Sequence, residues 1–134
     1  AQTKEPRELV AREAEALVLR YSALATSRDR LGAEHPQTID AAIALGAALA
    51  DMEEVGAAEP LLEQACVDAQ RLQGDRSRLL ARAYAGLSRV RSRQKRFEAA
   101  EELQCARLAV HRELDGEEHH QTAAALSDLA LVLL

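Results

Sequence analysis

The sequence predicts an all-α protein built as a solenoid of antiparallel helix pairs. Two features of its composition favour helices: Ala, Leu, Glu and Arg dominate the 134 residues, and only three Pro and six Gly are present. The third observation is a repeat, because small and apolar positions recur with a 42-residue period. A unit of that length accommodates two helices, which bury their apolar stripes fully only against neighbouring pairs.

The repeat is visible in two similar segments, 31–38 and 115–122, whose starting positions are two periods apart. Within a unit, apolar residues lie three, four or five positions apart, the spacing of one helical face, and a glycine follows where a helix would end. Four series carry the period: Gly32, Gly74 and Gly116; Ala16, Ala58 and Ala100; Leu19, Leu61 and Leu103; and Leu24, Cys66 and Leu108. We therefore expect one repeat domain, 1–134, divided into a half repeat 1–30, repeats 31–72 and 73–114, and a partial repeat 115–134.

Local signals locate the individual helices in each unit. Pro36 is preorganised for a first helical position, with His35 just before it. Ser77 occupies the corresponding place one unit later, where its hydroxyl can accept from a backbone N–H of the first turn. Gly74 closes the helix that precedes it. Together with the apolar pattern, these signals predict helices near 8–31, 36–52, 55–72, 77–94, 97–114 and 119–134.

Two motifs recur in these units. Residues 31–38 read Leu-Gly-Ala-Glu-His-Pro-Gln-Thr, and residues 54–65 read Glu-Val-Gly-Ala-Ala-Glu-Pro-Leu-Leu-Glu-Gln-Ala, with a counterpart at 97–103. Both motifs resemble the tetratricopeptide repeat (TPR) in its 42-residue, kinesin-light-chain-like form. The resemblance covers nearly the whole chain. It implies a right-handed superhelix in which the first helix of each pair lines a concave groove for peptides or partner proteins.

The groove departs from the pattern of that family, whose first helix carries a Leu-Asn-Asn-Leu-Ala string that binds the ligand backbone. The two Asn positions hold other residues in all three units: Ile43 and Ala44, Ala85 and Gly86, and Ser127 and Asp128. An alternative to a peptide-binding scaffold therefore stays open. In that alternative the chain is a structural spacer or oligomerisation element of a larger multidomain protein, which the Ala- and Arg-rich composition suggests is bacterial.

Charge is strongly segregated along the chain. Residues 71–96 contain nine basic residues and one acid, a net +8, so the remainder carries −13 to give the total of −5. This segregation can create a local positive field on an acidic body. The other interpretation is that the arginines pair with acids on neighbouring helices, such as Glu54, Glu98 or Glu101.

The basic residues Arg82, Arg89 and Arg93, which we call the basic stripe, lie at i, i+7 and i+11 and share one helical face. Guanidinium groups favour carboxylates and phosphates, so we expect an acidic or phosphorylated protein segment as partner. Duplex nucleic acid is disfavoured because the −13 remainder would repel its phosphates. The resemblance directs this stripe towards the groove, and the partner-binding set we predict is Asp40, Ile43, Asp51, Arg82, Arg89, Arg93, Ser127 and Leu131.

Other chemistry has little support in the sequence. Only three aromatic residues are present, no phosphate-binding glycine loop occurs, and neither cysteine stands in a nucleophile arrangement, so we expect no enzyme and no cofactor. Cys66 matches Leu24 and Leu108 and is expected in the core. The residues Glu117, Glu118, His119 and His120 are metal-ligand types, but a structural role is favoured. The absence of a signal segment, of a long apolar run and of a disulfide framework predicts a cytoplasmic protein with no membrane partner.

The last predicted helix ends in an apolar run, 129–134, interrupted only by small alanine. An uncovered apolar stripe at the end of a helical repeat favours association with another surface. We therefore expect a homo-oligomer formed through this helix. Because the chain starts at Ala1 rather than Met, we also expect it to be a segment of a longer gene product.

Overall fold

The computed structural model describes the backbone of residues 6–115 and 120–133, and the side chains of residues 11–115 and 123–133. These residues form helices and short turns, with no strand among them. Each helix begins and ends within two residues of its predicted position. The helices are α1 (Pro6–Leu31), α2 (Pro36–Asp51), α3 (Val55–Gln73), α4 (Arg78–Arg93), α5 (Phe97–Asp115) and α6 (His120–Leu133).

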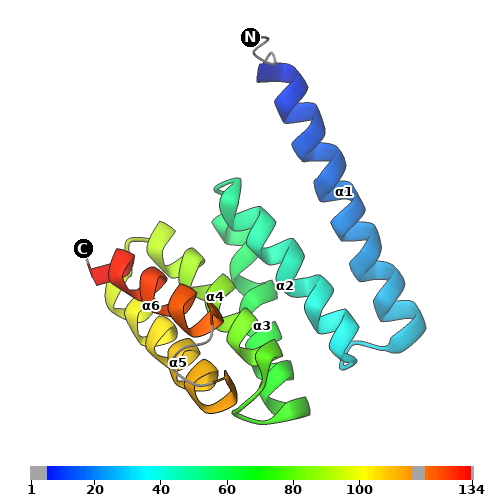
Figure 1. Cartoon of the computed structure of the whole chain (residues 1–134). Helices are drawn as coiled ribbons and strands as arrows, with labels where there is room; N and C mark the ends of the chain where they lie inside the picture. Colours follow the sequence, from blue (N-terminus) through cyan, green and yellow to red (C-terminus); the bar gives the residue numbers. More distant parts are fainter. Residues whose placement is uncertain (1–5, 116–119, 134) are drawn as a thin grey trace.

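Helices that follow one another in the chain pack side by side and antiparallel (Figure 1). Because α2 also contacts α4, the first helices of successive pairs adjoin one another and the pairs stack. The start of α1 extends beyond the other helices (Figure 1), and most of the described residues of α1 before Leu24 are exposed. This arrangement confirms the predicted all-α solenoid of helix pairs.

The predicted caps are present at two helix starts and two helix ends. The Ser77 hydroxyl accepts from the Leu80 N–H at 3.0 Å, and His35 Nδ1 accepts from the Gln37 N–H at 3.1 Å. Gly32 and Gly74 have φ of +88° and +80°, the left-handed region that side chains disfavour. Gly116, the third member of this series, lies outside the described residues.

The turn inside each complete helix pair was not predicted. Glu53 and Lys95, which occupy equivalent positions in successive repeats, adopt φ of +63° and +62° although neither is glycine. In both turns the next residue returns to the preceding helix: the Glu54 N–H donates to the Leu49 carbonyl and the Arg96 N–H to the Arg91 carbonyl, each at 2.8 Å. These bonds satisfy carbonyls at the helix end and offset the cost of the left-handed residue.

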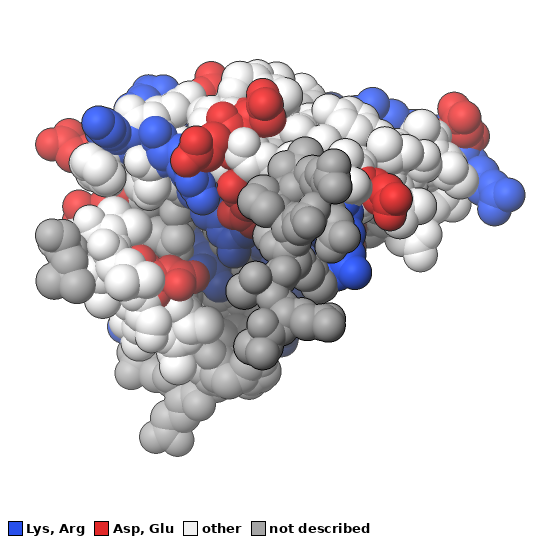
Figure 2. Space-filling model, turned by 90° about the horizontal axis from the view of Figure 1, so that it is seen from above, with Lys and Arg blue, Asp and Glu red and all other residues white. Residues whose placement is uncertain are grey.

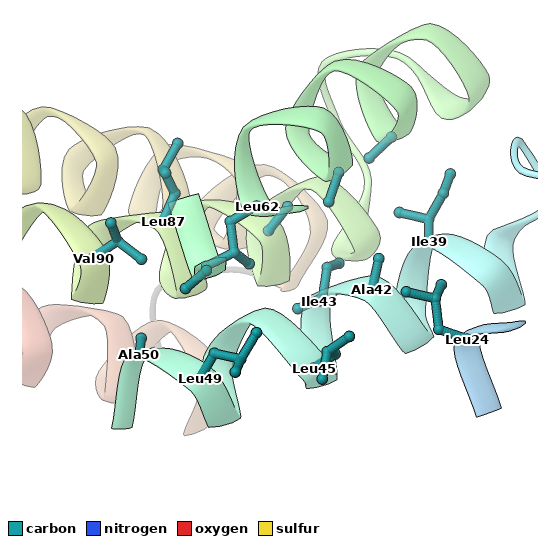
Figure 3. Close-up of a cluster of buried hydrophobic side chains, with 14 of the residues drawn as sticks. Leu24, Ile39, Ala42, Ile43, Leu45, Leu49, Ala50, Leu62, Leu87 and Val90 are labelled. Carbon is teal, nitrogen blue, oxygen red and sulfur yellow. The ribbon is translucent and has the colours of Figure 1, made fainter. Parts of the chain in front are cut away.

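The centre of the core is the contact between α3 and its two neighbours. Leu62 of α3 is fully buried between Gly46 of α2 and Gly86 of α4 (Figure 3 shows Leu62 between α2 and α4). A methyl group built on Gly46 would lie 2.6 Å from Leu62 Cγ, and one built on Gly86 would lie 2.7 Å from a Leu62 Cδ. The helices therefore approach closely because both positions lack a side chain. We call Gly46, Leu62 and Gly86 the first joint.

The equivalent contact one repeat later is polar. At the positions one period further on, Ser88, Gln104 and Asp128 replace Gly46, Leu62 and Gly86, and Arg107 replaces Ala65. A chain of side-chain bonds connects them: Gln104 Nε2 donates to Ser88 Oγ at 2.7 Å, and Arg107 Nη1 donates to Gln104 Oε1 at 3.4 Å and Asp128 Oδ2 at 2.5 Å. We call Ser88, Gln104, Arg107 and Asp128 the second joint.

Candidate binding groove

A cavity of about 370 Å³ is lined by residues of α4, α5 and α6 and by Asp51 at the end of α2. The second joint forms part of its wall, so the polar chain between the helices is also a cavity surface. We call it the groove cavity. Its wall consists of Asp51, Ala85, Ser88, Arg89, Ser92, Arg93, Gln104, Arg107, Asp128, Leu131 and Val132.

Four of the eight predicted partner-binding residues line this cavity. They are Asp51 from α2, Arg89 and Arg93 from α4, and Leu131 from α6. Asp40 and Arg82 form an ion pair with each other nearer the N-terminal ends of α2 and α4. Ser127 is exposed on α6 but does not line the cavity.

The prediction that Ile43 contacts a partner is wrong. Its side chain is only 4% exposed and belongs to the apolar core, where Figure 3 shows it among the buried side chains on α2 facing α3. The register of the family motif located the position correctly on the first helix, but an isoleucine there gains more from burial than from contact with water. The corresponding residue of the next repeat, Ala85, does line the groove cavity.

The basic stripe is paired with acids of α2, and the pairing loosens along its length. Arg82 is hydrogen-bonded to Asp40, its equivalent position in the preceding repeat. Arg89 lies 3.5 Å from Asp51, and Arg93 lies 3.5 Å from Glu53 of the following turn. Both of those distances exceed the ordinary hydrogen-bond range. The two arginines at the cavity are therefore held electrostatically, not by a specific bond.

Four other arginines of the basic segment pair with acids of other helices or turns, as the second interpretation of the charge pattern predicts, although the acids differ from those named. Arg91 contacts both Glu59 at 3.0 Å and Glu63 at 2.8 Å. A hydrogen bond from Gln94, followed by the charge of Arg91, lowers the pKa of Glu59. The remaining pairs are Arg71 with Glu34, Arg76 with Glu113 and Arg78 with Asp115. Figure 2 accordingly shows basic and acidic side chains next to one another around a hollow in the surface.

The second joint was missed as part of the site. Arg107 occupies the position that Ala23 and Ala65 hold in the preceding units, and it is not among the predicted partner-binding residues. The signal that could have found the site is a change at four positions at once: from the first joint to the second, each small or apolar residue is replaced by a polar one. Burying a single polar side chain without a hydrogen-bond partner costs free energy. Four polar side chains that bond to one another supply each other's hydrogen-bond partners.

The cysteines and histidines offer no separate site in the described part of the chain. Burial raises the pKa of the Cys66 thiol to about 12, so its reactive thiolate is suppressed. Among described side chains, no three His, Cys, Asp or Glu residues gather as metal ligands would. The predicted metal-ligand types Glu117, Glu118 and His119 lie outside the described residues, as does the side chain of His120. Within the described ranges, no helix has the length and apolar character to cross a membrane.

Comparison with known proteins identifies the fold. No protein-family model matches this chain, and no curated protein is significantly similar to it in sequence. Its structure is similar to the crystal structure of BtubC (BKLC) from P. vanneervenii, with a TM-score of 0.79 and 20% identity. The match covers 91% of this chain but only 49% of that one, so the chain spans about half the length of the solved structure. The likeness supports a TPR-like helical-repeat fold.

Proposed function

We propose that this chain is a non-enzymatic protein-interaction scaffold that binds an acidic segment of a partner in the groove cavity. The observation that carries the proposal is the state of Arg89 and Arg93. Both lie at the cavity wall with their carboxylate neighbours at 3.5 Å, beyond a good hydrogen bond. A carboxylate or phosphate of a partner can therefore form the bidentate bonds that these guanidinium groups lack.

The α6 side of the cavity favours a polypeptide over a small anion. Leu131, whose exposure is 71%, and Val132 present apolar surface beside the two arginines. An acidic segment that carries one aliphatic residue would bury that surface and meet both guanidinium groups at once. This combination of charge and apolar contact supports a mixed acidic and aliphatic segment as the ligand.

The test is binding of the labelled peptide Glu-Glu-Glu-Leu-Glu-Glu-Glu, measured by fluorescence anisotropy at several salt concentrations. Affinity should fall as salt is added, because the contacts are exposed charges. The double variant Arg89→Ala with Arg93→Ala should weaken binding by about tenfold or more, a loss of about 1.4 kcal/mol. A phosphoserine version of the peptide tests whether a phosphorylated segment binds more tightly.

The matched control is Arg71→Ala with Arg76→Ala, which removes two positive charges at exposed positions outside the cavity. Circular dichroism checks that both double variants remain helical. If the two double variants lose affinity equally, the attraction is a property of overall charge, and the groove cavity is not the site.

A second candidate function, oligomerisation, is supported by the exposed apolar faces of the two terminal helices. α6 exposes Leu126, Leu131 and Leu133, and α1 exposes Val18, Leu19 and Tyr21. A contact between α6 of one copy and α1 of another would cover both faces in a head-to-tail arrangement. Because the two faces differ, this contact can repeat from copy to copy and link more than two.

Sedimentation velocity at increasing concentration tests this candidate. Assembly should be lost in Leu133→Glu and also in Leu19→Glu, because each change charges one side of the contact. Leu72→Glu, at an exposed leucine of α3, is the control and should leave assembly unchanged. A wild-type chain that stays monomeric at every concentration contradicts the oligomer.

A further inference from the structure

A second cavity, of about 400 Å³, lies between α1, α2 and α3. None of its wall residues lines the groove cavity, so the two sites are separate. Its apolar floor comes from all three helices and includes Leu24, Ile39, Ala42, Leu61 and Ala65. Figure 3 shows Leu24, Ile39 and Ala42 together at the end of the core nearest α1. We call this space the α1–α3 cavity.

The wall of the α1–α3 cavity contains an unpartnered hydroxyl group. Thr38 lines the cavity and is only 2% exposed, and its Oγ1 has no hydrogen-bond partner among the described residues. Buried hydroxyl groups are normally paired, because an unpaired one loses its bonds to water without replacement. A bound group with a hydroxyl of its own would supply the missing partner.

The next repeat shows what fits such a space. One period further along the chain, the wall residues Leu24, Ala33 and Thr38 become Cys66, Asp75 and Leu80. At a fourth wall position the size change is large, because Ala42 becomes Tyr84. The repeats are therefore equivalent in backbone position but differ in these four side chains, and the largest difference in size is the phenol ring of Tyr84.

By the 42-residue period, Tyr84 stands at the position equivalent to Ala42. Tyr84 is half-buried and packs on the core of the protein. Burial raises the pKa of its hydroxyl, and the charges of Cys66 and Asp75 raise it further. They are the counterparts of Leu24 and Ala33 in the α1–α3 cavity. The first repeat has Ala42 at the position where that ring would attach.

We propose that the α1–α3 cavity binds the tyrosine side chain of a partner polypeptide, which takes the place that Tyr84 occupies in the following repeat. The apolar floor covers the ring, and the Thr38 hydroxyl meets the phenol oxygen. The rim favours no charge sign, since Glu34 and Arg71 pair at 2.7 Å and Arg28 and Asp68 lie beside them. A tyrosine within a polar stretch of chain suits this rim, and the site does not require the acidic segment of the groove.

The test is methyl NMR of the full chain, titrated with p-cresol and with N-acetyl-Gly-Tyr-Gly-amide. Both should shift the methyl signals of Leu24, Ile39 and Leu61 saturably, with a Kd on the order of 1 mM for the free ring. Toluene, which lacks the hydroxyl, should bind more weakly than p-cresol. That preference should disappear in Thr38→Val, which keeps the shape of the wall and removes its oxygen.

The variant Ala42→Tyr supplies the missing ring covalently. It should weaken p-cresol binding at least tenfold and raise the Tm by about 3 °C, because it fills the cavity. Ala47→Tyr, at another half-buried alanine of α2 outside the cavity wall, is the control and should leave binding intact.

Three results would overturn the proposal. The first is the absence of saturable methyl shifts with p-cresol. The second is a toluene affinity equal to that of p-cresol in the wild-type chain, which would leave the hydroxyl without a role. The third is binding of p-cresol without binding of the tyrosine tripeptide, which would make the cavity a site for small aromatic molecules only.

Discussion

The two joints of this solenoid solve the same packing problem with opposite chemistry. In the first joint, Leu62 fills the space between Gly46 and Gly86, and the contact is dry and apolar. In the second joint, Gln104 stands where Leu62 does and bonds to Ser88 and, through Arg107, to Asp128. The backbone positions correspond through the 42-residue period, so the difference lies in the side chains alone.

The comparison indicates that different residues of this chain provide stability and binding. An apolar joint is stabilised by close packing and tolerates little change of shape. A polar joint is stabilised by bonds that depend on all of its members, and it presents those polar groups to the groove cavity. We therefore expect the first joint to hold the solenoid together and the second to shape the binding surface.

The largest effect should come from removing the central side chain of the first joint, and the same change in the second joint should cost less. Leu62→Ala should lower the free energy of unfolding by about 3 kcal/mol, because it leaves a cavity between close-packed helices. Gln104→Ala should cost about 1 kcal/mol, since its main effect is to leave the Ser88 hydroxyl unpaired. Urea unfolding measures both, with Leu72→Ala at an exposed leucine as the control. Equal losses at Leu62 and Gln104 would erase the distinction between the joints.

The next effect tests shape at the first joint. Gly46→Ala should cost about 2 kcal/mol, because the new methyl group would lie 2.6 Å from Leu62 Cγ and overpack the contact. Gly56→Ala is the matched control: it adds the same group in open space and should cause no loss. Combining Gly46→Ala with Leu62→Ala should cost less than the sum of the two, since the smaller residue makes room. An additive double variant would mean that Leu62 is not the obstacle.

A smaller effect should report the ion pair of the second joint. Arg107 is largely buried whereas Asp128 is about half exposed, so solvent screens their attraction in part. A double-mutant cycle with alanine at both positions should give a coupling of about 0.5–1 kcal/mol in urea unfolding. The same cycle on the more exposed pair Arg76 and Glu113 should give a coupling near zero. A near-zero value at Arg107 and Asp128 would remove that pair from the stabilising network.

The smallest effect is a pH dependence of stability that arises from one residue of α5, His111. His111 is 3% exposed and stands where the first repeat has Ala69. Burial lowers its pKa from the ordinary 6.5. The bond to Asp115 opposes that shift, and the charges of Arg107 and Arg78 assist it. The unfolded chain therefore binds a proton more readily than the folded one, so stability is full above pH 6.5 and decreases as the pH falls below it.

Urea unfolding at a series of pH values between about 8 and 5 checks this direction. The variant His111→Gln should show a shallower loss over that range, because the neutral amide does not titrate. A wild-type chain whose stability rises on acidification through this range would show that the Asp115 bond, not burial, determines the proton affinity of His111.

Much of the fold could be predicted because the positions of the helices follow the 42-residue period of the sequence. The 42-residue repeat, with glycines at fixed offsets, determines where helices end, whatever their packing, and the caps at His35 and Ser77 are local. Ala58 and Ala100, which belong to one of the periodic series, are both fully buried. The left-handed residues Glu53 and Lys95 were not predicted, because neither is a residue that ordinarily marks that conformation.

The site was predictable only in part. Charge counting found the basic segment and the helix period found the stripe, and four of the predicted residues do line one cavity. The prediction that Ile43 contacts a partner was wrong, because it rested on the position of Ile43 in the family motif. The side chain at that position is apolar and packs in the core instead of facing the groove. The ion pairs of these arginines could not be predicted, because their acidic partners on α2 are far away in the sequence. Only the packing of α2 against α4 brings them together.

The sequence by itself determined the helix positions, their caps and the segregation of charge, because each of these depends on residues within one turn or on simple counting. The tertiary structure alone decided which side chains meet across helices: Leu62 with two glycines, Gln104 with Ser88, Arg107 with Asp128, and the open spaces beside Ala42 and Arg89. Such contacts join residues of different helices, far apart in the sequence, and their geometry depends on how closely whole helices approach. The distance between two packed helices is determined by the whole solenoid and cannot be found from one segment of the sequence.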